Sequence, residues 1–206
     1  EISCSLVGSE MCIRDSPMQI QLLDCAAAQQ IYETRMVQDF PAAELKPFSA
    51  VREMMQAGIY EPLVLCDAAG ALQAYAWQVL LPGRRSALLD YFAVRSDLRG
   101  GGIGTQALHA LARHYADRLD DLILECEHPD EAPDRAVARR RIAFYLRAGA
   151  CATRIESRVF GVRYNILTLP CGGHAQDAVI GQELKELYRM MVPEPYYRGN
   201  VIFFGA

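Results

Sequence analysis

A glycine-rich turn between an expected strand and an expected helix constrains this chain most. Residues 88–94, LLDYFAV, form an apolar run that is long enough for one buried strand and rich in strand-favouring residue types. Over residues 103–115, apolar residues recur at the helical period and predict a helix with one buried face. Residues 99–104, RGGGIG, join the two. This order predicts an α/β fold in which bare backbone can approach a ligand between a strand and a helix.

The start of the expected helix is suited to bind a phosphate group. The first N–H groups of a helix have no partner inside the helix, and they lie at the positive end of the helix dipole. Arg99 would add a fixed positive charge beside them. An ordinary glycine-rich turn without a ligand is the alternative, because a glycine motif on its own is a weak signal.

Two other phosphate-binding loops can be compared with this segment. A Walker-type loop requires Lys and then Ser or Thr after its last glycine, whereas Thr and Gln follow Gly104. The dinucleotide fingerprint fits better, because Gly102, Gly104 and Ala107 match its G-x-G-x-x-A form. Glu125 also lies about 20 residues further on, as that fingerprint requires. A Rossmann domain needs several strand-helix-strand units, however, and only one more strand-helix pair follows this one.

Two motifs together resemble the GNAT superfamily of N-acetyltransferases. Arg99, Gly102 and Gly104 directly follow the strand and resemble that family's loop for the pyrophosphate of acetyl-CoA. The family pattern is Arg or Gln, two residues, Gly, one residue, and then Gly or Ala. Further on, residues 142–150, IAFYLRAGA, resemble the later family motif, in which a helix that carries a tyrosine ends at Gly followed by an apolar residue. The resemblance covers roughly residues 18–169.

The resemblance implies an α/β (α+β) fold with a mixed, mostly antiparallel central sheet flanked by helices. The strand at residues 88–94 and a strand at residues 122–127 would run parallel and splay apart at the cofactor site. Beyond the core that the family shares, the residues themselves predict a C-terminal helix and a short strand. Acetyl-CoA is implied as the co-substrate, with its pantetheine arm between the splayed strands. The residues expected to contact acetyl-CoA are Phe92, Ala93, Val94, Arg99, Gly100, Gly101, Gly102, Ile103, Gly104 and Thr105.

Acetyl transfer from a thioester to an amine needs an acid for the departing thiolate and a route for the amine proton. Tyr145 aligns with the family's tyrosine near the CoA sulfur and is the predicted acid; a core tyrosine on an amphipathic helix is the alternative. The candidate bases or amine anchors are Glu125, Glu127 and Asp90, all on expected strands. The two glutamates are two residues apart and therefore share a face. Each carboxylate could instead form a structural ion pair, which for Asp90 would be with an arginine.

The sequence therefore predicts an acetyl-CoA-dependent N-acetyltransferase that acts on a small amine. Because no Ser-His-Asp or Cys-His arrangement is recognisable, direct attack is expected rather than an acyl-enzyme. A non-catalytic module that binds or senses CoA and a nicotinamide-dependent enzyme stay open as alternatives. A formal net charge of −4 argues against nucleic acid and anionic membranes as partners, and the four histidines show no metal-ligand spacing. A monomer or a homodimer is expected.

Capping signals predict helices elsewhere in the chain. Asp24 can cap the first helix, and Ser49 can cap a second helix, which Gly58 would end. Apolar residues at the helical period over residues 180–191 predict an amphipathic helix near the C-terminus. Residues 201–204 are expected to form a short strand.

A single domain is expected over residues 18–206, with the core at residues 18–169 and a C-terminal extension at residues 170–206. Residues 1–17 show neither a helical nor a strand period and are interpreted as a non-native or disordered segment. Seven cysteines, an odd number without a C-x-x-C pair, favour free thiols and a cytoplasmic location.

Overall fold

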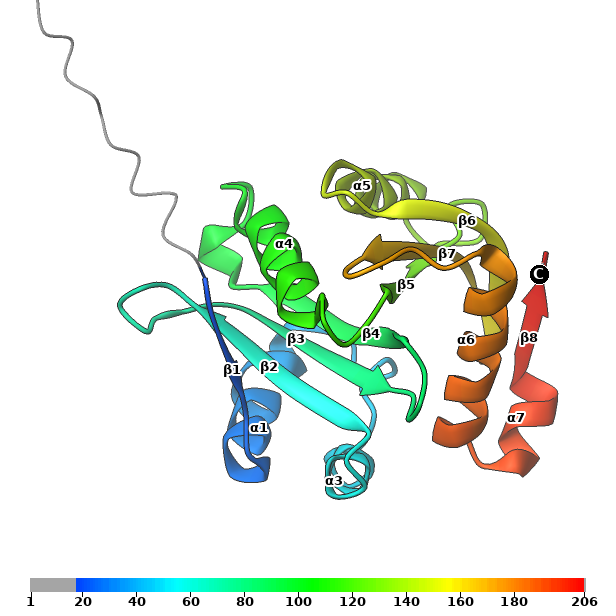
Figure 1. Cartoon of the computed structure of the whole chain (residues 1–206), viewed down its shortest axis with the longest axis horizontal. Coiled ribbons are helices and arrows are strands. Elements are labelled where there is room, and N and C mark those ends of the chain that lie inside the picture. Colours follow the sequence, from blue (N-terminus) through cyan, green and yellow to red (C-terminus); the bar gives the residue numbers. More distant parts are fainter. Residues whose placement is uncertain (1–17, 206) are drawn as a thin grey trace, which may run out of the picture.

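An eight-stranded mixed sheet organises the computed structural model, which describes residues 18–205. The interpretation of residues 1–17 lies outside the described residues. The strands follow the order β1-β2-β3-β4-β5-β7-β6-β8, and every neighbouring pair is antiparallel except the parallel pair β4 and β5. Helices cover both faces of the sheet (Figure 1). The expected mixed, mostly antiparallel sheet with one parallel pair is confirmed.

The strands expected at residues 88–94, 122–127 and 201–204 are present, each within two residues of the expected bounds. The strands are β1 (Gln19–Leu22), β2 (Tyr60–Cys66), β3 (Leu72–Leu80), β4 (Ser86–Val94), β5 (Asp121–Glu127), β6 (Cys151–Val159), β7 (Val162–Pro170) and β8 (Val201–Phe204). The helices are α1 (Cys25–Ile31), the π-helical η2 (Tyr32–Met36), α2 (Val37–Asp39), α3 (Phe48–Gln56), the 3-10 turn η3 (Ser96–Leu98), α4 (Ile103–Tyr115), α5 (Arg135–Arg147), α6 (Asp177–Met191) and α7 (Glu194–Asn200).

The sequence predicted the N-cap of α1 but not that of α3. The Asp24 carboxylate accepts a hydrogen bond from the Ala27 amide at 2.8 Å, as expected for an N-cap. The prediction that Ser49 caps α3 was wrong, because this helix begins at Phe48, which places Ser49 inside its first turn, and no side chain caps it. Pro47 occupies the N-cap position, and its carbonyl accepts the first helical bonds. Gly58 ends the helix with a φ of 71°, as expected.

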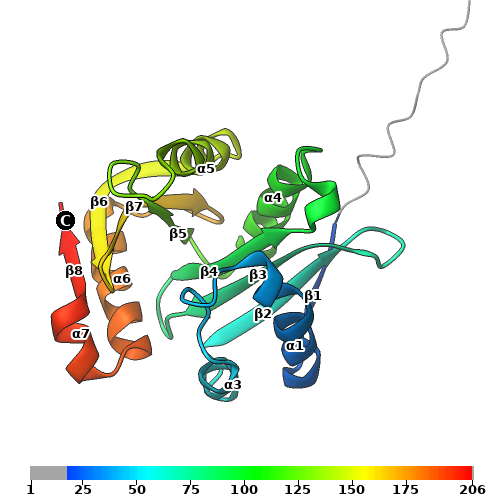
Figure 2. The same ribbon diagram turned by 180° about the vertical axis from the view of Figure 1, so that it is seen from behind.

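Two apolar clusters lie on opposite faces of the sheet. One includes Trp77 and Ile123 and packs against α1, α3 and α6. The other includes Leu122 and Leu124 and packs against α4 and α5. Consecutive residues of β5 belong to different clusters, because successive side chains of a strand point to opposite faces of the sheet. Figures 1 and 2 show α4 and α5 on one side of the sheet and α1 and α3 on the other.

The C-terminal extension is part of this core. Helix α6 contributes Ile180, Leu184 and Leu187, none of which is exposed. Strand β8 pairs antiparallel with β6 and extends the sheet. Helix α7 was not expected from the sequence. Within residues 18–205, no helix is both long and apolar enough to span a membrane.

Candidate active site

The parallel strands β4 and β5 separate soon after they meet. Their pairing is limited to three residue pairs, which begin at Ser86 with Asp121 and end at Leu88 with Ile123. Beyond that point β4 stays paired with β3 as far as Val94, and β5 stays paired with β7 throughout. The backbone of β4 that faces β5 is therefore free of a strand partner over residues 89–94, which is the splayed arrangement expected from the sequence.

The glycine-rich turn leads directly from β4 into helix α4. Gly102 occupies the N-cap of α4 with a φ of 85°, and no side chain caps this helix. Such a left-handed conformation favours glycine, which lacks a Cβ atom. The N–H groups of the first turn, at Ile103, Gly104 and Thr105, are thus available to an anion. A Cβ atom at Gly104 would lie 3.0 Å from Cζ of Phe144, so this glycine lets α4 pack closely against α5.

The side chain of Arg99 is hydrogen-bonded to the end of β4 and to α2, and does not project freely into solvent. Its Nε donates to the carbonyl of Val94 at 3.0 Å, and its Nη2 donates to Oδ1 of Asp39 at 2.6 Å. The other oxygen of Asp39 accepts from the hydroxyl of Tyr75 at 2.9 Å. Half of the Arg99 side chain remains exposed, so its guanidinium still contributes positive charge next to the turn.

Tyr145 lies on α5, on the face of the sheet that α4 and α5 cover. It packs in the cluster that contains Cys126 of β5, and its ring lies 5.1 Å from that of Phe144. Burial, with a smaller effect of the Cys126 thiol, raises the pKa of Tyr145. The phenol therefore stays protonated at neutral pH. Its hydroxyl has no hydrogen-bond partner among residues 18–205.

Asp90 occupies a bulge in β4 and is held in an ion pair. The register of β3 with β4 moves from Trp77 opposite Tyr91 to Gln78 opposite Leu89, which leaves Asp90 without a partner. An extra residue in a strand places consecutive side chains on one face.

Both oxygens of Asp90 have partners on that face. One accepts from Lys46 Nζ at 2.5 Å and the other from the hydroxyl of Tyr60 at 2.6 Å. The side chain of Asp90 is only 8% exposed. Asp90 thus forms the ion pair that was the alternative reading, but with a lysine from the loop between α2 and α3 and not with an arginine. Burial would lower the pKa of Lys46, but the charge and hydrogen bond of Asp90 outweigh this effect and raise it.

Glu125 points to the same face as Asp90 and is partly buried. Its Oε2 accepts from the hydroxyl of Tyr188 at 2.5 Å, and its Oε1 accepts from Ser157 Oγ at 3.3 Å. Burial raises the pKa of Glu125 to about 7, although Tyr188, Lys46 and Ser157 all act to lower it. A carboxyl with such a pKa can gain and lose a proton near neutral pH.

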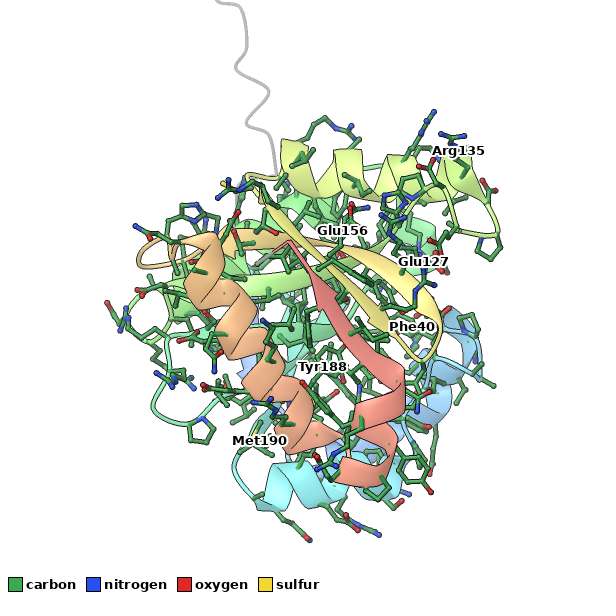
Figure 3. The ribbon with its side chains drawn as sticks, turned by 90° about the vertical axis from the view of Figure 1, so that its right-hand side faces the viewer. Phe40, Glu127, Arg135, Glu156, Tyr188 and Met190 are labelled. Atoms are coloured by element: carbon green, nitrogen blue, oxygen red, sulfur yellow. The ribbon has the colours of Figure 1, made fainter. Side chains whose placement is uncertain are left out.

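Glu127 lies two residues further along β5, at the outer end of the separated strands. Its carboxylate is 3.9 Å from the guanidinium of Arg141, and it is partly exposed. Burial and the nearby charge of Glu127 raise the pKa of Glu44 on the loop between α2 and α3. Three carboxylates, from Glu44, Glu125 and Glu127, therefore lie near the separated strands. Figure 3 shows Glu127 and Tyr188 from the side of α6 and β8.

None of the partners of Asp90, Glu125 and Glu127 was anticipated from the sequence: Lys46, Tyr60, Arg141, Ser157 and Tyr188. Tyr188 is the one of these whose sequence context hints at a buried hydrogen bond. It lies on a stripe of otherwise apolar residues, and a buried tyrosine needs a partner for its hydroxyl. No group of three or more His, Cys, Asp or Glu side chains in the described part of the chain could hold a metal ion.

Comparisons with known proteins agree with this geometry. The model of the acetyltransferase (GNAT) family matches residues 28–149, which is more than half of the chain. This range includes the splayed strands, the glycine-rich turn and Tyr145. No curated protein matches the sequence at a significant level.

Solved structures share the fold at low sequence identity. A protein from Bacteroides thetaiotaomicron assigned to the GNAT family is 20% identical with a TM-score of 0.63, covering 86% of this chain and 98% of its own. The ribosomal-protein-S18-alanine N-acetyltransferase from Escherichia coli is 20% identical with a TM-score of 0.55, covering 78% and 97%. The spermidine N-acetyltransferase from Vibrio cholerae, in complex with CoA and spermine, is 11% identical with a TM-score of 0.56, covering 76% and 97%.

The family match and the fold together confirm the enzyme class expected from the sequence, an acetyl-CoA-dependent N-acetyltransferase. Strands that separate beside an uncapped glycine-rich helix start are what the two sequence motifs implied. This chain belongs to the GNAT family of acetyltransferases.

Proposed function

We propose that this enzyme transfers the acetyl group of acetyl-CoA to a small-molecule amine by direct attack of the amine. The observation that carries the proposal is the separation of β4 and β5 beyond Leu88 and Ile123, next to the uncapped start of α4. The residues at this place fit acetyl-CoA. Within Phe92, Ala93 and Val94, the backbone groups of β4 that face β5 have no strand partner and can hydrogen-bond to the amides of the pantetheine arm. The N–H groups of residues 102–105 suit its pyrophosphate.

Tyr145 and Glu125 have complementary proton chemistry on the two sides of the separated strands. Acetyl-CoA, when bound, supplies a thioester carbonyl that an amine can attack. The protonated phenol of Tyr145 donates a proton to the departing sulfur. Glu125 accepts the proton that the attacking amine loses, and its pKa of about 7 suits this role. Glu127 is the second candidate for the base. Asp90 is the weaker one, because its carboxylate is neutralised in an ion pair with Lys46 and its side chain is only 8% exposed.

The acceptor is best described as a cationic amine. Glu44, Glu125 and Glu127 lie on the acceptor side, where their charges complement an ammonium group. The two N-acetyltransferases named above act on spermidine and on a ribosomal protein. Both are amine acceptors of very different size, so the acceptor of this enzyme is best identified by a direct assay.

Ligand-induced thermal shifts test the proposal. Acetyl-CoA and CoA should raise the unfolding temperature, because a ligand at 100 times its Kd stabilises a protein by about 2.7 kcal/mol, and NAD should not. Release of the CoA thiol in the presence of an amine panel that includes spermidine should then report turnover. A shift with NAD alone would favour a nicotinamide-dependent enzyme. Binding of CoA without turnover for any amine would favour a non-catalytic CoA-binding module.

A further inference from the structure

Tyr188 is hydrogen-bonded to Glu125, the candidate base, although it lies outside the residues that match the family model. It lies on α6, whereas the family match ends at residue 149. Its hydroxyl donates to Oε2 of Glu125 at 2.5 Å across 63 residues of sequence. This distance is typical of a strong hydrogen bond to a charged oxygen.

The position of Tyr188 is fixed by the rest of the C-terminal extension. The residue is 7% exposed, and its ring lies 6.0 Å from that of Phe203 on β8. Tyr188 lies between α6 and β8 in Figure 3. Strand β8 is in turn paired with β6, which carries Ser157, the second donor to Glu125. One oxygen of the Glu125 carboxylate is thus bonded to a residue of the C-terminal extension, and the other to a strand that the extension pairs with.

Glu125 is surrounded by groups from every element that packs on it. The groups that face it are Tyr188 of α6, Ser157 of β6, Tyr164 of β7, Asp90 of β4 and Lys46 of the loop between α2 and α3. Only Tyr188 and Ser157 are hydrogen-bonded to it. Because the bond to Tyr188 is the shorter by 0.8 Å (3.3 Å against 2.5 Å), it is the stronger constraint on the carboxylate.

We propose that Tyr188 is a positioning residue that orients the Glu125 carboxylate for proton transfer from the acceptor amine, which makes the C-terminal extension a part of the active site. This inference rests on the proposed function, because it takes Glu125 as the base. A hydroxyl that donates to one oxygen fixes the plane of the carboxylate and leaves its other lone pairs for the amine. It also favours the charged form of the carboxylate.

A titration of Glu125 tests the contact without any knowledge of the acceptor. The carboxyl carbon of Glu125 can be followed by NMR in full-length protein labelled with 13C-glutamate, and its signal is assigned by its loss in Glu125→Gln. The wild-type midpoint is expected near pH 7. In Tyr188→Phe it should rise by about one pH unit, because the charged form loses a donor. Equal midpoints in the two proteins would overturn the proposal.

Kinetics with acetyl-CoA and an amine that the panel identifies test the catalytic consequence. Tyr188→Phe should lower kcat roughly ten- to hundredfold while the Kd of acetyl-CoA changes less than about twofold. In a Glu125→Gln background the same substitution should have almost no further effect, because Tyr188 acts through Glu125. Tyr196→Phe is the matched control, since Tyr196 lies in the same extension and is 62% exposed.

Three outcomes would count against the positioning role: an unchanged kcat in Tyr188→Phe, an equal loss in both backgrounds, or a parallel loss in Tyr196→Phe. Failure of the wild-type enzyme to acetylate any amine despite binding acetyl-CoA would instead contradict the proposed function. The midpoint titration separates these cases, because it does not depend on turnover. Thermal unfolding of Tyr188→Phe distinguishes a local effect on Glu125 from a loss of folded protein.

Discussion

The hydroxyl of Tyr145 has no hydrogen-bond partner among residues 18–205, unlike the hydroxyls of three other tyrosines near the separated strands. Tyr60, Tyr91 and Tyr188 all donate hydrogen bonds to protein groups. A Tyr145→Phe substitution removes only a hydroxyl that no described residue needs, so the unfolding temperature should stay nearly constant. Turnover should fall at least about tenfold, because the thiolate loses its proton donor. Thiol release and the Kd of acetyl-CoA, measured side by side, check this; unchanged turnover would remove Tyr145 from the mechanism.

The raised pKa of Glu125 makes folding stability depend on pH. The usual carboxyl pKa is 4.5 and the folded value is about 7, so between these values the folded protein binds more protons than the unfolded chain. The contribution of Glu125 to stability is therefore complete below about pH 4.5 and is lost as the pH rises to about 7. Glu125→Gln removes this dependence. Its unfolding temperature, relative to wild type, should rise from pH 4.5 to pH 7. A difference that does not vary with pH would contradict the raised pKa.

The ion pair of Asp90 with Lys46 should matter more for stability than exposed pairs do. Asp90→Asn leaves a lysine that is 33% exposed without its counter-charge, and we expect a loss of about 2 kcal/mol in unfolding free energy. Asp97→Asn breaks the pair of Asp97 with Arg95, in which Asp97 is 61% exposed, and should leave the unfolding free energy almost unchanged. Urea unfolding of both variants measures the two losses, and equal losses would show that the bulge does not depend on Asp90.

The sequence identified the unusual carboxylates but not their partners. Asp90 and Glu125 were recognisable because charged residues are rare on central strands. Their partners Lys46 and Tyr188 are 44 and 63 residues away, respectively, in sequence. No local pattern specifies such contacts, because they depend on how distant elements pack. The bulge that turns Asp90 toward Lys46 depends on the register with β3, which a single strand does not encode.

At the scale of the elements, the close contact of α4 with α5 at Gly104 links the glycine-rich turn to the helix of Tyr145. Gly104→Ala would place a Cβ atom 3.0 Å from the ring of Phe144 and 3.4 Å from a methyl group of Val94. We expect a net loss of about 1 kcal/mol in unfolding free energy, because overpacking outweighs the gain in helix propensity. Gly101→Ala is the control, since its nearest neighbour would be 3.5 Å away. Equal stability of the two variants would contradict this tight contact.

Elements with strong periodicity were predicted well, and those set by neighbours were not. The bounds of α4 and β8 agree with the sequence pattern, because apolar spacing and glycines mark them. Helix α7 was missed, because its seven residues, EPYYRGN, include a proline and a glycine and no helical stripe. The π-helical segment η2 within the first helix also had no signal in the sequence.

At the scale of the whole molecule, we propose that residues 18–206 fold as one unit. A chain that ends at Pro170 would lose Ile180, Leu184 and Leu187, whose burial contributes roughly 6 kcal/mol, which is comparable to the stability of an entire domain. It should show no cooperative unfolding transition by circular dichroism. A chain that begins at Met18 should unfold at the same temperature as the full sequence. A folded protein ending at Pro170 would show that the extension is an accessory.

The continuity of the eight-stranded sheet depends on the three residue pairs that join β4 to β5. These pairs join two halves of the sheet, and beyond Leu88 and Ile123 no strand pairing connects β4 to β5. A ligand that hydrogen-bonds to both separated strands would replace the missing bonds between them. It would therefore make the middle of the sheet more rigid. Deuterium uptake by the amides of residues 89–94 should therefore slow when acetyl-CoA is added. Amides in β1, at the edge of the sheet three strands away from β4, should exchange at their original rates.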